Sequence, residues 1–313
     1  KHLITMKDVY QLADLSSREI LDAGADKPAR LAVIGHPVSH SASPAMHQAA
    51  LDAHGKDIRY IRLEVEPGQV AEALQQMKQL DFIGCNVTVP HKFEVMDCCD
   101  DLSEDARAMG AVNTVIFGDQ TLGHNTDAPG LVRAIREDFG IDLADLKVMI
   151  VGVGGGAGRA VATQCARIGC DQIWLVNRTL EKAQNLLTEL ESHGGQTNHL
   201  AGPGERFTAM APQDPDIAEA AGHAELIINA TSLGLRSFDR KPLPSKCIQP
   251  HHLVYDMIYN PAQTNLLSHA QSVGARTANG LSMLLHQGVL AYECWFPGDT
   301  PLEHMRKGLL GSL

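Results

Sequence analysis

The chain has 313 residues, of which 44% are hydrophobic, and its 26 lysines and arginines stand against 37 aspartates and glutamates. This length and this hydrophobic content allow two domains of ordinary size, each with a core of its own. The formal net charge of -11 argues against nucleic acid or an anionic membrane as the main partner, because both bind basic surfaces. An anionic ligand must therefore be held by local positive charge.

The first residues and the cysteines favour a cytoplasmic protein. No apolar run is long enough to span a bilayer, and Lys1 to Thr5 do not form the apolar core of a signal peptide. The seven cysteines show no Cys-x-x-Cys spacing, which favours free thiols in a reducing compartment. His36, His40 and His47 lie close in sequence, but no cysteine or carboxylate beside them completes a zinc ligand set, so we expect no metal site.

Predicted strands and helices alternate from Leu31 onwards, which is typical of an α/β fold. Residues 1–27 form a charged N-terminal extension that we expect to be helical. The predicted strands cover residues 31–34, 58–65, 82–88, 111–117, 121–123, 148–151, 173–176 and 226–228. The predicted helices cover residues 44–55, 70–80, a region ending at 108, 128–139, a segment ending at 168, and one beginning at 280.

The segment 86–92 reads Asn-Val-Thr-Val-Pro-His-Lys and places polar side chains on an otherwise apolar strand. Alternation puts Asn86 and Thr88 on one face, where an amide and a hydroxyl can meet a ligand. The proline ends the strand because it cannot donate to a ladder, and Lys92 follows it. An edge strand with a surface lysine would explain the same pattern. A second polar segment, which ends in Asp127, supplies a carboxylate and favours a ligand site.

A glycine-rich segment at 152–158 lies between a predicted strand and a predicted helix. Gly152, Gly154 and Ala157 match the dinucleotide fingerprint G-x-G-x-x-G/A. Its first residue allows a tight turn, its second the approach of a pyrophosphate, and its third the packing of helix on strand. The pyrophosphate would lie at the helix N-terminus, where unpaired N–H groups favour negative charge. A simple tight turn is the alternative, but the strand at 173–176 follows at the spacing of a nucleotide site.

The residues after this second strand distinguish the two nicotinamide cofactors. Where an NAD enzyme places an acid on the ribose 2'-hydroxyl, this chain has Asn177, Arg178 and Thr179. A guanidinium can fork onto a 2'-phosphate, which an acid would repel. We therefore predict NADP rather than NAD. Alternatively, Arg178 caps the following helix or pairs with Glu181.

Several short motifs occur together and in one order along the chain. They are Ser39-His40-Ser41-Ala42-Ser43-Pro44, the segment 86–92, Gly110-Ala111-Val112-Asn113-Thr114, Asn125-Thr126-Asp127, the glycine-rich loop, Asn177-Arg178-Thr179, Asn229-Ala230-Thr231-Ser232-Leu233-Gly234, Asp256-Met257-Ile258-Tyr259 and the segment 283–287. In this order they resemble shikimate dehydrogenase, from Leu31 to the C-terminus. The resemblance implies a two-lobed α/β protein that reversibly reduces 3-dehydroshikimate to shikimate with NADP, in the pathway to aromatic amino acids.

The resemblance implies that Lys92 and Asp127 are the catalytic residues. Ketone reduction needs a hydride donor and, at the carbonyl oxygen, a group that stabilises negative charge and delivers a proton. Lys92 would be held by Asp127, donate toward the C3 oxygen in reduction, and accept the proton in the reverse direction. A cap on the helix that begins at Ala128 is another role for Asp127.

By the same resemblance, neutral hydrogen-bonding side chains bind a polyhydroxylated carboxylate. The substrate carboxylate would contact Ser41 and Ser43, assisted by Tyr259, and the ring hydroxyls would contact Asn86, Thr88, Asn113, Asp127 and Gln287. Each has an ordinary structural explanation as well. Ser43 can cap a helix before Pro44, Tyr259 can close a turn, and Gln287 can lie partly exposed on an apolar helix.

The resemblance also implies the cofactor-binding residues and the domains. The cofactor-binding residues would be Gly152, Gly154, Gly155, Gly156, Ala157, Asn177, Arg178, Thr179, Thr231, Ser232, Met257 and Gly280. The domains would be the N-terminal extension at 1–27, an α/β substrate-binding domain at 28–127, a Rossmann NADP-binding domain at 128–279, and C-terminal helices at 280–313 that return to the substrate-binding domain. The expected partner is the small-molecule substrate, and a homodimer is possible in this family.

The chain departs from the family pattern in three places. Ala128 replaces a frequent glycine, His124 replaces an acidic or aromatic residue, and the N-terminal extension is additional. Quinate dehydrogenase is one alternative function, although Thr179 in place of an acid disfavours its NAD-using members. Methylene-tetrahydrofolate dehydrogenase also has a lysine in a cleft, but we do not expect it to carry the substrate-binding serines. A non-catalytic sensor is disfavoured by the intact lysine and aspartate.

Overall fold

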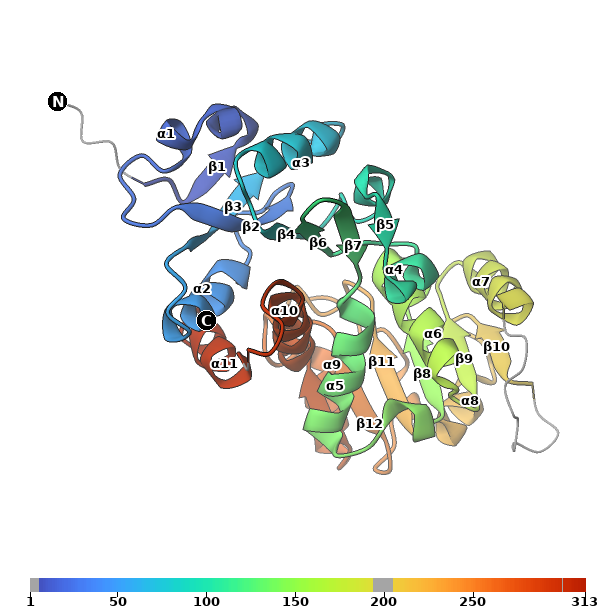
Figure 1. Ribbon diagram of the computed structural model, residues 1–313. Helices are drawn as coiled ribbons and strands as arrows, with labels where there is room; N and C mark the ends of the chain where they lie inside the picture. Colours follow the sequence, from blue (N-terminus) through green and yellow to red (C-terminus); the bar gives the residue numbers. More distant parts are fainter. Residues whose placement is uncertain (1–5, 194–204, 300) are drawn as a thin grey trace. The chain divides into compact units, whose positions relative to one another are not determined.

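The computed structural model describes residues 6–193, 205–299 and 301–313, and the chain divides into two compact units (Figure 1). Unit 1 consists of Lys1–Gly130 and Leu285–Leu313, and unit 2 consists of Leu131–Leu284. Each unit has one β-sheet with helices packed on it. The predicted α/β fold class is therefore confirmed.

Unit 1 contains a seven-stranded mixed sheet in the order β1-β3-β2-β4-β6-β7-β5. The strands are β1 (Val9–Gln11), β2 (Ala29–Gly35), β3 (Arg59–Glu64), β4 (Gly84–Val87), β5 (Asp101–Leu102), β6 (Thr114–Phe117) and β7 (Thr121–His124). The helices are α1 (Arg18–Leu21), α2 (Ser43–Ala53), α3 (Val70–Gln79), α4 (Glu104–Met109) and α11 (Leu302–Leu310), with 3-10 turns η1 (Leu12–Ser16) and η2 (Glu94–Cys98). The strands β1 to β4 pair in parallel, and β6 runs antiparallel to both β4 and β7.

The N-terminal extension is not wholly helical, so that expectation is wrong for β1. This strand lies parallel to β3, with Val9 opposite Arg62, and forms the edge of the sheet. Tyr10 is only 3% exposed because its ring packs into the core of unit 1. A β-branched residue followed by an aromatic one suits a half-buried strand. The extension does contain the helix α1, whose N-cap Ser17 accepts a hydrogen bond from Ile20 N through its side chain.

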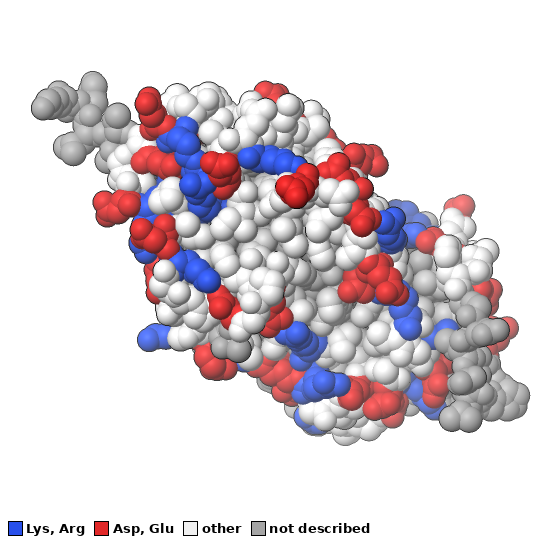
Figure 2. All heavy atoms as spheres, in the orientation of Figure 1, with Lys and Arg blue, Asp and Glu red and all other residues white. Residues whose placement is uncertain are grey.

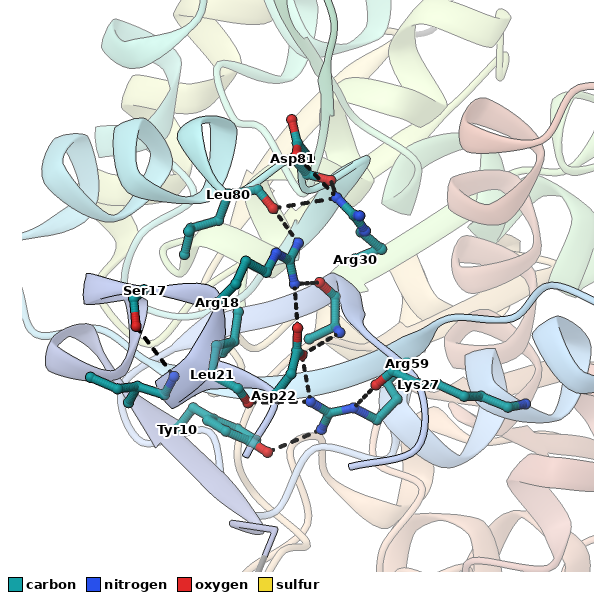
Figure 3. Close-up of polar contacts among 12 residues, drawn as sticks. Tyr10, Ser17, Arg18, Leu21, Asp22, Lys27, Arg30, Arg59, Leu80 and Asp81 are labelled. Atoms are coloured by element: carbon teal, nitrogen blue, oxygen red, sulfur yellow. Dashed lines mark hydrogen bonds and ion pairs between the residues drawn. The ribbon is translucent and has the colours of Figure 1, made fainter. Parts of the chain in front are cut away.

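Asp22 joins the extension to the two neighbouring strands β2 and β3 (Figure 3). Its carboxylate accepts hydrogen bonds from Arg59 Nη2 at 2.9 Å, Arg18 Nη1 at 3.0 Å and Ala29 N at 2.8 Å. Arg59 also donates to Tyr10 Oη at 3.0 Å. Burial by itself raises the pKa of Asp22, but the hydrogen bonds from Ala29, Arg59 and Arg18 outweigh it and lower the pKa below its usual 3.8. The ionised carboxylate therefore stabilises the folded state.

We predict that Asp22→Asn lowers the free energy of unfolding by about 2 kcal/mol at neutral pH, because two arginines lose a charged partner. A group with a lowered pKa stabilises the fold above its unfolded-state pKa and stops doing so as the pH falls through its folded-state pKa. The difference between wild type and variant should thus shrink below about pH 4. Urea denaturation from pH 7 downwards measures it. Asp26→Asn is the control, since Asp26 is exposed; a difference that does not depend on pH would contradict the prediction.

Unit 2 contains a six-stranded parallel sheet in the order β10-β9-β8-β11-β12-β13. The strands are β8 (Val148–Val151), β9 (Ile173–Val176), β10 (Phe207–Met210), β11 (Leu226–Asn229), β12 (Leu253–Asp256) and β13 (Arg276–Asn279). The helices are α5 (Asp127–Phe139), α6 (Gly156–Ile168), α7 (Leu180–His193), α8 (Ile217–His223) and α9 (Asn265–Ser272), with 3-10 turns η3 (Leu143–Asp145) and η4 (Ser245–Cys247). Helix α10 (Leu281–Trp295) begins in unit 2, and its residues from Leu285 onwards belong to unit 1. Both α5 and α10 have their first or last residues in unit 1.

The strands of unit 2 are buried on both faces, as in other parallel sheets. Val148 and Ile150 point into a core formed with α5, α6 and α7, and Met149 and Val151 point into a core formed with α8 and α9. The strand order is that of the Rossmann fold, and it reverses direction between β8 and β11. Ligands of such sheets bind beyond the carboxyl ends of the strands at this point.

Candidate functional site

The glycine-rich loop follows β8 and leads into α6. Gly152 has a φ of +98°, which L side chains rarely adopt, so the turn requires glycine. A Cβ atom at Gly158 would lie 2.2 Å from the carbonyl oxygen of Gly152, so the helix packs closely on the turn here. We expected Ala157 to occupy this packing position, which is wrong. Because α6 begins at Gly156, Ala157 lies exposed on its first turn, and the next residue faces the strand.

The N-terminus of α6 is open to an anion. Its N-cap residue Gly155 provides no side-chain hydrogen bond, and no acidic residue lies in the first turn. A Cβ atom at Gly156 would meet no atom within 4 Å. The first N–H groups of a helix have no partner within it, and with the helix dipole they favour a phosphate group. These residues therefore fit the pyrophosphate of a dinucleotide.

The turn after β9 is tied to the glycine loop. Asn177 Oδ1 accepts a hydrogen bond from Gly154 N at 3.0 Å, and Asn177 Nδ2 donates to Thr179 O at 2.9 Å. Lys182, which our sequence analysis did not select, has its Cδ 2.9 Å from where a Cβ of Gly154 would be. Arg178 is exposed and, among the described residues, has no ion-pair partner, so it does not pair with Glu181.

A pocket of about 570 Å³ lies in unit 2 at the carboxyl ends of the central strands. It is lined by Val151, Gly152, Asn177, Arg178, Pro212, Gln213, Thr231, Ser232, Leu233, Arg240, Lys241, Pro242, Leu243, Pro244 and Ser245. Five of the predicted cofactor-binding residues are among them. The other wall of the pocket, from residue 240 to 245, was missed because it lies on an irregular loop without a periodic pattern. Met257 and Gly280 abut each other elsewhere in unit 2, where a Cβ at Gly280 would be 2.0 Å from Met257 O.

The loop after β11 is held by hydrogen bonds at its start. Thr231 donates through its amide and its hydroxyl to Asn229 Oδ1, at 3.0 and 2.7 Å, and Asn229 Nδ2 donates to the buried Asp256 at 3.0 Å. Burial raises the pKa of Asp256 above its usual value. The hydrogen bonds from Thr264, Ile258 and Asn229 lower the pKa but do not outweigh the effect of burial. These contacts fix Thr231 at the pocket.

In unit 1, the structure brings Lys92 and Asp127 together although 35 residues separate them. Lys92 Nζ lies 2.6 Å from Asp127 Oδ2, and the two side chains are 30% and 21% exposed. The amide of Val112 donates to the carbonyl of Lys92 at 2.8 Å, which anchors the lysine backbone. The pair is partly buried yet reachable by a small molecule.

Asp127 does not cap the helix that follows it, so that interpretation is wrong. Instead Asn125 Oδ1 accepts a hydrogen bond from Ala128 N at 3.1 Å, and Asn125 Nδ2 donates to Ala111 O at 3.1 Å. Because Asn125 satisfies the start of α5, the carboxylate of Asp127 is available to Lys92.

A buried hydrogen-bond network lies beside this pair. Asn86 Oδ1 accepts from Tyr60 Oη at 2.7 Å, and Asn86 Nδ2 donates to Asn113 O at 3.3 Å and to Thr114 Oγ1 at 3.2 Å. Both atoms of the Asn86 amide thus have protein partners, and the residue is 5% exposed. Asn86 therefore holds the strands β3, β4 and β6 together at this point.

The network continues to the residue that precedes Asp127. Asn113 Nδ2 donates to Thr126 Oγ1 at 2.8 Å and lies 3.5 Å from Gln287 Oε1, while Asn113 Oδ1 accepts from Thr126 N at 2.8 Å. Asn113 and Thr126 are 2% and 4% exposed. Satisfied polar groups at this depth are rigid, because breaking one bond leaves an unpaired buried atom. The backbone at Asp127 is fixed in this way.

The remaining predicted substrate residues lie in different surroundings. Ser43 is the first residue of α2, whose N-cap is Ala42, so the expectation that Ser43 caps this helix is wrong. Ser41 Oγ accepts from Ser43 N at 3.3 Å, and Ser41 O accepts from Arg62 Nη2 at 2.9 Å. Thr88 is half-buried beyond the end of β4, in unit 1. The predicted tyrosine, residue 259, is half-buried in unit 2 after β12.

The Rossmann unit with its basic pocket, and the α/β unit with its lysine–aspartate pair, define a nicotinamide-dependent dehydrogenase. Family models match most of the chain: the shikimate dehydrogenase substrate binding domain at residues 33–115, shikimate / quinate 5-dehydrogenase at 133–233, and the shikimate 5'-dehydrogenase C-terminal domain at 280–310. The chain therefore belongs to the shikimate dehydrogenase family.

Relatives with known names are similar over almost their whole length. Shikimate dehydrogenase (NADP(+)) of Methanopyrus kandleri is 38% identical over 284 residues, which cover 90% of this chain and 94% of the relative. The structure of shikimate 5-dehydrogenase from Thermus thermophilus with NADP(H) and shikimate is 32% identical, with a TM-score of 0.77 over 91% of this chain and 100% of that one. Quinate dehydrogenase from Corynebacterium glutamicum in complex with NAD is 29% identical, with a TM-score of 0.79 and the same coverage.

Two glycine substitutions separate packing from ligand binding in the loop. We predict that Gly158→Ala destabilises the protein by about 1–3 kcal/mol, because its methyl group meets backbone that cannot move aside. Gly156→Ala should leave stability unchanged or slightly raised, since its Cβ meets open space, but should weaken NADP binding. Thermal unfolding and titration with NADP measure the two effects. Wild-type NADP affinity in Gly156→Ala would contradict a pyrophosphate at this helix start.

Proposed function

We propose that the protein catalyses the reversible, NADP-dependent reduction of 3-dehydroshikimate to shikimate. The observation that carries this proposal is the 2.6 Å contact between Lys92 and Asp127, set beside a rigid network of neutral polar groups in a member of this family. The cofactor, when bound as NADPH, would supply the hydride that reduces the ketone carbon, and as NADP it would accept the hydride in the reverse direction. The residues of the chain must bind the substrate, orient it and handle one proton.

Lys92 stabilises the charge that develops on the C3 oxygen and donates a proton to it during reduction. In the reverse direction it accepts the proton from the C3 hydroxyl. Asp127 orients the ammonium group through the short contact and offers its second oxygen to a ring hydroxyl. Two groups held at fixed positions before the substrate binds need no rearrangement in the transition state, which is the main source of electrostatic catalysis.

The substrate carboxylate is assigned to the hydroxyls of Ser41 and Ser43, assisted by Tyr259. The ring hydroxyls are assigned to Thr88, Asn113, Asp127 and Gln287. Both polar atoms of the Asn86 side chain already have hydrogen-bond partners within the protein. We therefore assign Asn86 the role of positioning Asn113, whose carbonyl oxygen it contacts.

NADP is supported as the cofactor by the absence of an acid after β9 and by the basic residues at that place. Arg178 would contact the 2'-phosphate, with Lys182 close by over the glycine loop. The full set of proposed cofactor-binding residues is Gly152, Gly154, Gly155, Gly156, Ala157, Asn177, Arg178, Thr179, Thr231, Ser232, Met257 and Gly280. A preference for NADP over NAD follows because a 2'-phosphate gains charge-assisted hydrogen bonds that a hydroxyl cannot make.

Oxidation of quinate is the second candidate, supported by the similarity to the quinate dehydrogenase of Corynebacterium glutamicum. We also propose a cytoplasmic enzyme that binds neither nucleic acid nor membrane and that can form a homodimer. Acidic and basic side chains are intermixed on the face drawn in Figure 2, without the basic stripe that nucleic acid requires. No helix in the described part of the chain is long and apolar enough to cross a bilayer.

The test is turnover of shikimate and quinate side by side, with NADP and with NAD. We expect shikimate with NADP to be the best pair. Lys92→Ala should lower kcat by about 100-fold or more while changing KM for shikimate much less, because the lost group acts in the transition state. Lys307→Ala, at an exposed position in α11, is the control and should behave as wild type.

Two results would overturn this proposal. If Lys92→Ala keeps near-normal turnover, the lysine does not carry the proton. If the wild type binds shikimate tightly without oxidising it, the protein is a sensor rather than an enzyme.

A further inference from the structure

The pocket of unit 2 has charged side chains of one sign only. They are Arg178, Arg240 and Lys241, and no carboxylate is among the residues that line the pocket. Within residues 6–193, 205–299 and 301–313, neither Arg178 nor Arg240 has an ion-pair partner. The chain as a whole has a net charge of -11, so a pocket lined by basic residues without an acid departs from the overall composition. Like charges that face one pocket repel each other unless an anion lies between them.

The loop that carries Arg240 is held in one conformation directly before this residue. Asp239 Oδ2 accepts hydrogen bonds from the amides of Gly234 and Arg236, both at 3.0 Å. Asn265 Nδ2, from α9, donates to the carbonyl of Asp239 at 3.1 Å. The carboxylate next to Arg240 is therefore used within the loop, and the backbone from which Arg240 emerges is anchored to the body of unit 2.

Lys241 is also directed along the wall of the pocket. Its Nζ donates to Ser245 Oγ, and both residues line the pocket. Prolines at 242 and 244 restrict the backbone between them. The position of the ammonium group is thus set by the protein, which lowers the entropic cost of binding an anion.

The neighbours of these cations identify the part of the cofactor that they face. The pocket is lined by Arg178 after β9 and by Pro212 and Gln213 after β10. In a Rossmann sheet, the end of the second strand, here β9, contacts the adenosine ribose. Arg240 and Lys241 share a pocket with these residues and therefore face the adenosine half, in which the 2'-phosphate distinguishes NADP from NAD.

We propose that Arg240 and Lys241 bind the 2'-phosphate of NADP together with Arg178, so that the loop after β11 is a second determinant of cofactor choice. This inference rests on the proposed cofactor, but not on the proposed substrate. A phosphate monoester carries a charge of about -1.5 to -2 at neutral pH and three acceptor oxygens, so one guanidinium does not neutralise it. The additional arginine and lysine supply the missing charge from the loop after β11.

Calorimetric titration with two nucleotides tests the assignment without any turnover. Adenosine 2',5'-bisphosphate has the 2'-phosphate, and adenosine 5'-monophosphate lacks it. We expect Arg240→Ala to weaken binding of the bisphosphate by about tenfold, as for the loss of one charge-assisted contact, and binding of the monophosphate less than about twofold. Lys241→Ala should act in the same direction, and the double variant more strongly than either.

Arg236→Ala is the matched control. Arg236 lies on the same loop, but its guanidinium stands over the ring of Phe238 at 5.8 Å and does not line the pocket. Arg236→Ala changes the net charge by the same amount as Arg240→Ala, so a general electrostatic effect would appear equally in both variants. Arg240 is exposed, and unchanged thermal unfolding of each variant establishes that the fold is intact.

Steady-state kinetics give a second readout. Arg240→Ala should raise KM for NADP about tenfold and leave kcat and KM for NAD unchanged. The inference is overturned if the double variant binds the bisphosphate as well as wild type, or if both nucleotides lose affinity equally. A wild type that does not prefer the bisphosphate would overturn the cofactor assignment as well. A wild type that prefers the bisphosphate but does not oxidise shikimate would overturn only the proposed substrate.

Discussion

The contact between Lys92 and Asp127 depends on a constraint that organises unit 1: buried polar groups must be paired. Asn125 satisfies the first turn of α5, which leaves the carboxylate of Asp127 for the lysine. Asn113 and Thr126 satisfy each other, which fixes the backbone directly before Asp127. A charged pair placed by flexible neighbours would sample many geometries. Here the neighbours are buried and hydrogen-bonded to one another, so the pair is held ready for a substrate.

Local signals in the sequence were sufficient to predict the central strands of the Rossmann unit. The predicted strands at 148–151 and 173–176 coincide with β8 and β9, because each is a short apolar run bounded by turn residues. The motifs from residue 39 to 287 were sufficient to identify the family. They were also sufficient to select Lys92 and Asp127, although no local pattern could establish that the two side chains touch.

The errors arose where several residues in a row suit one role. Ser41 and Ala42 precede α2 and Ser43 begins it, while Asn125 precedes α5 and Asp127 begins it. In both places the backbone conformation, not the residue type, decides which residue caps the helix. The strand β1 was missed for another reason. Three residues within a charged segment carry little pattern, and β1 exists through pairing with β3, some 50 residues away in the sequence.

Separation along the sequence also explains why the sequence analysis selected only some of the basic residues that line the pocket. Arg178 stands at a position that a fingerprint defines, whereas Arg240 and Lys241 follow a different strand on a loop without periodicity. Only the order of strands around β8 brings the two segments to one place. Charge composition gave a hint, since an acidic chain that binds an anion must collect its cations locally.

The three-residue strand β1 has a consequence for the behaviour of the chain outside catalysis. It covers β3, which would otherwise be the outermost strand, with unpaired N–H and C=O groups over six residues. Such a strand is a template for pairing with other molecules and for aggregation. The N-terminal segment, anchored by Asp22, thus shortens the exposed edge of β3, since β1 pairs with Arg62, Leu63 and Glu64.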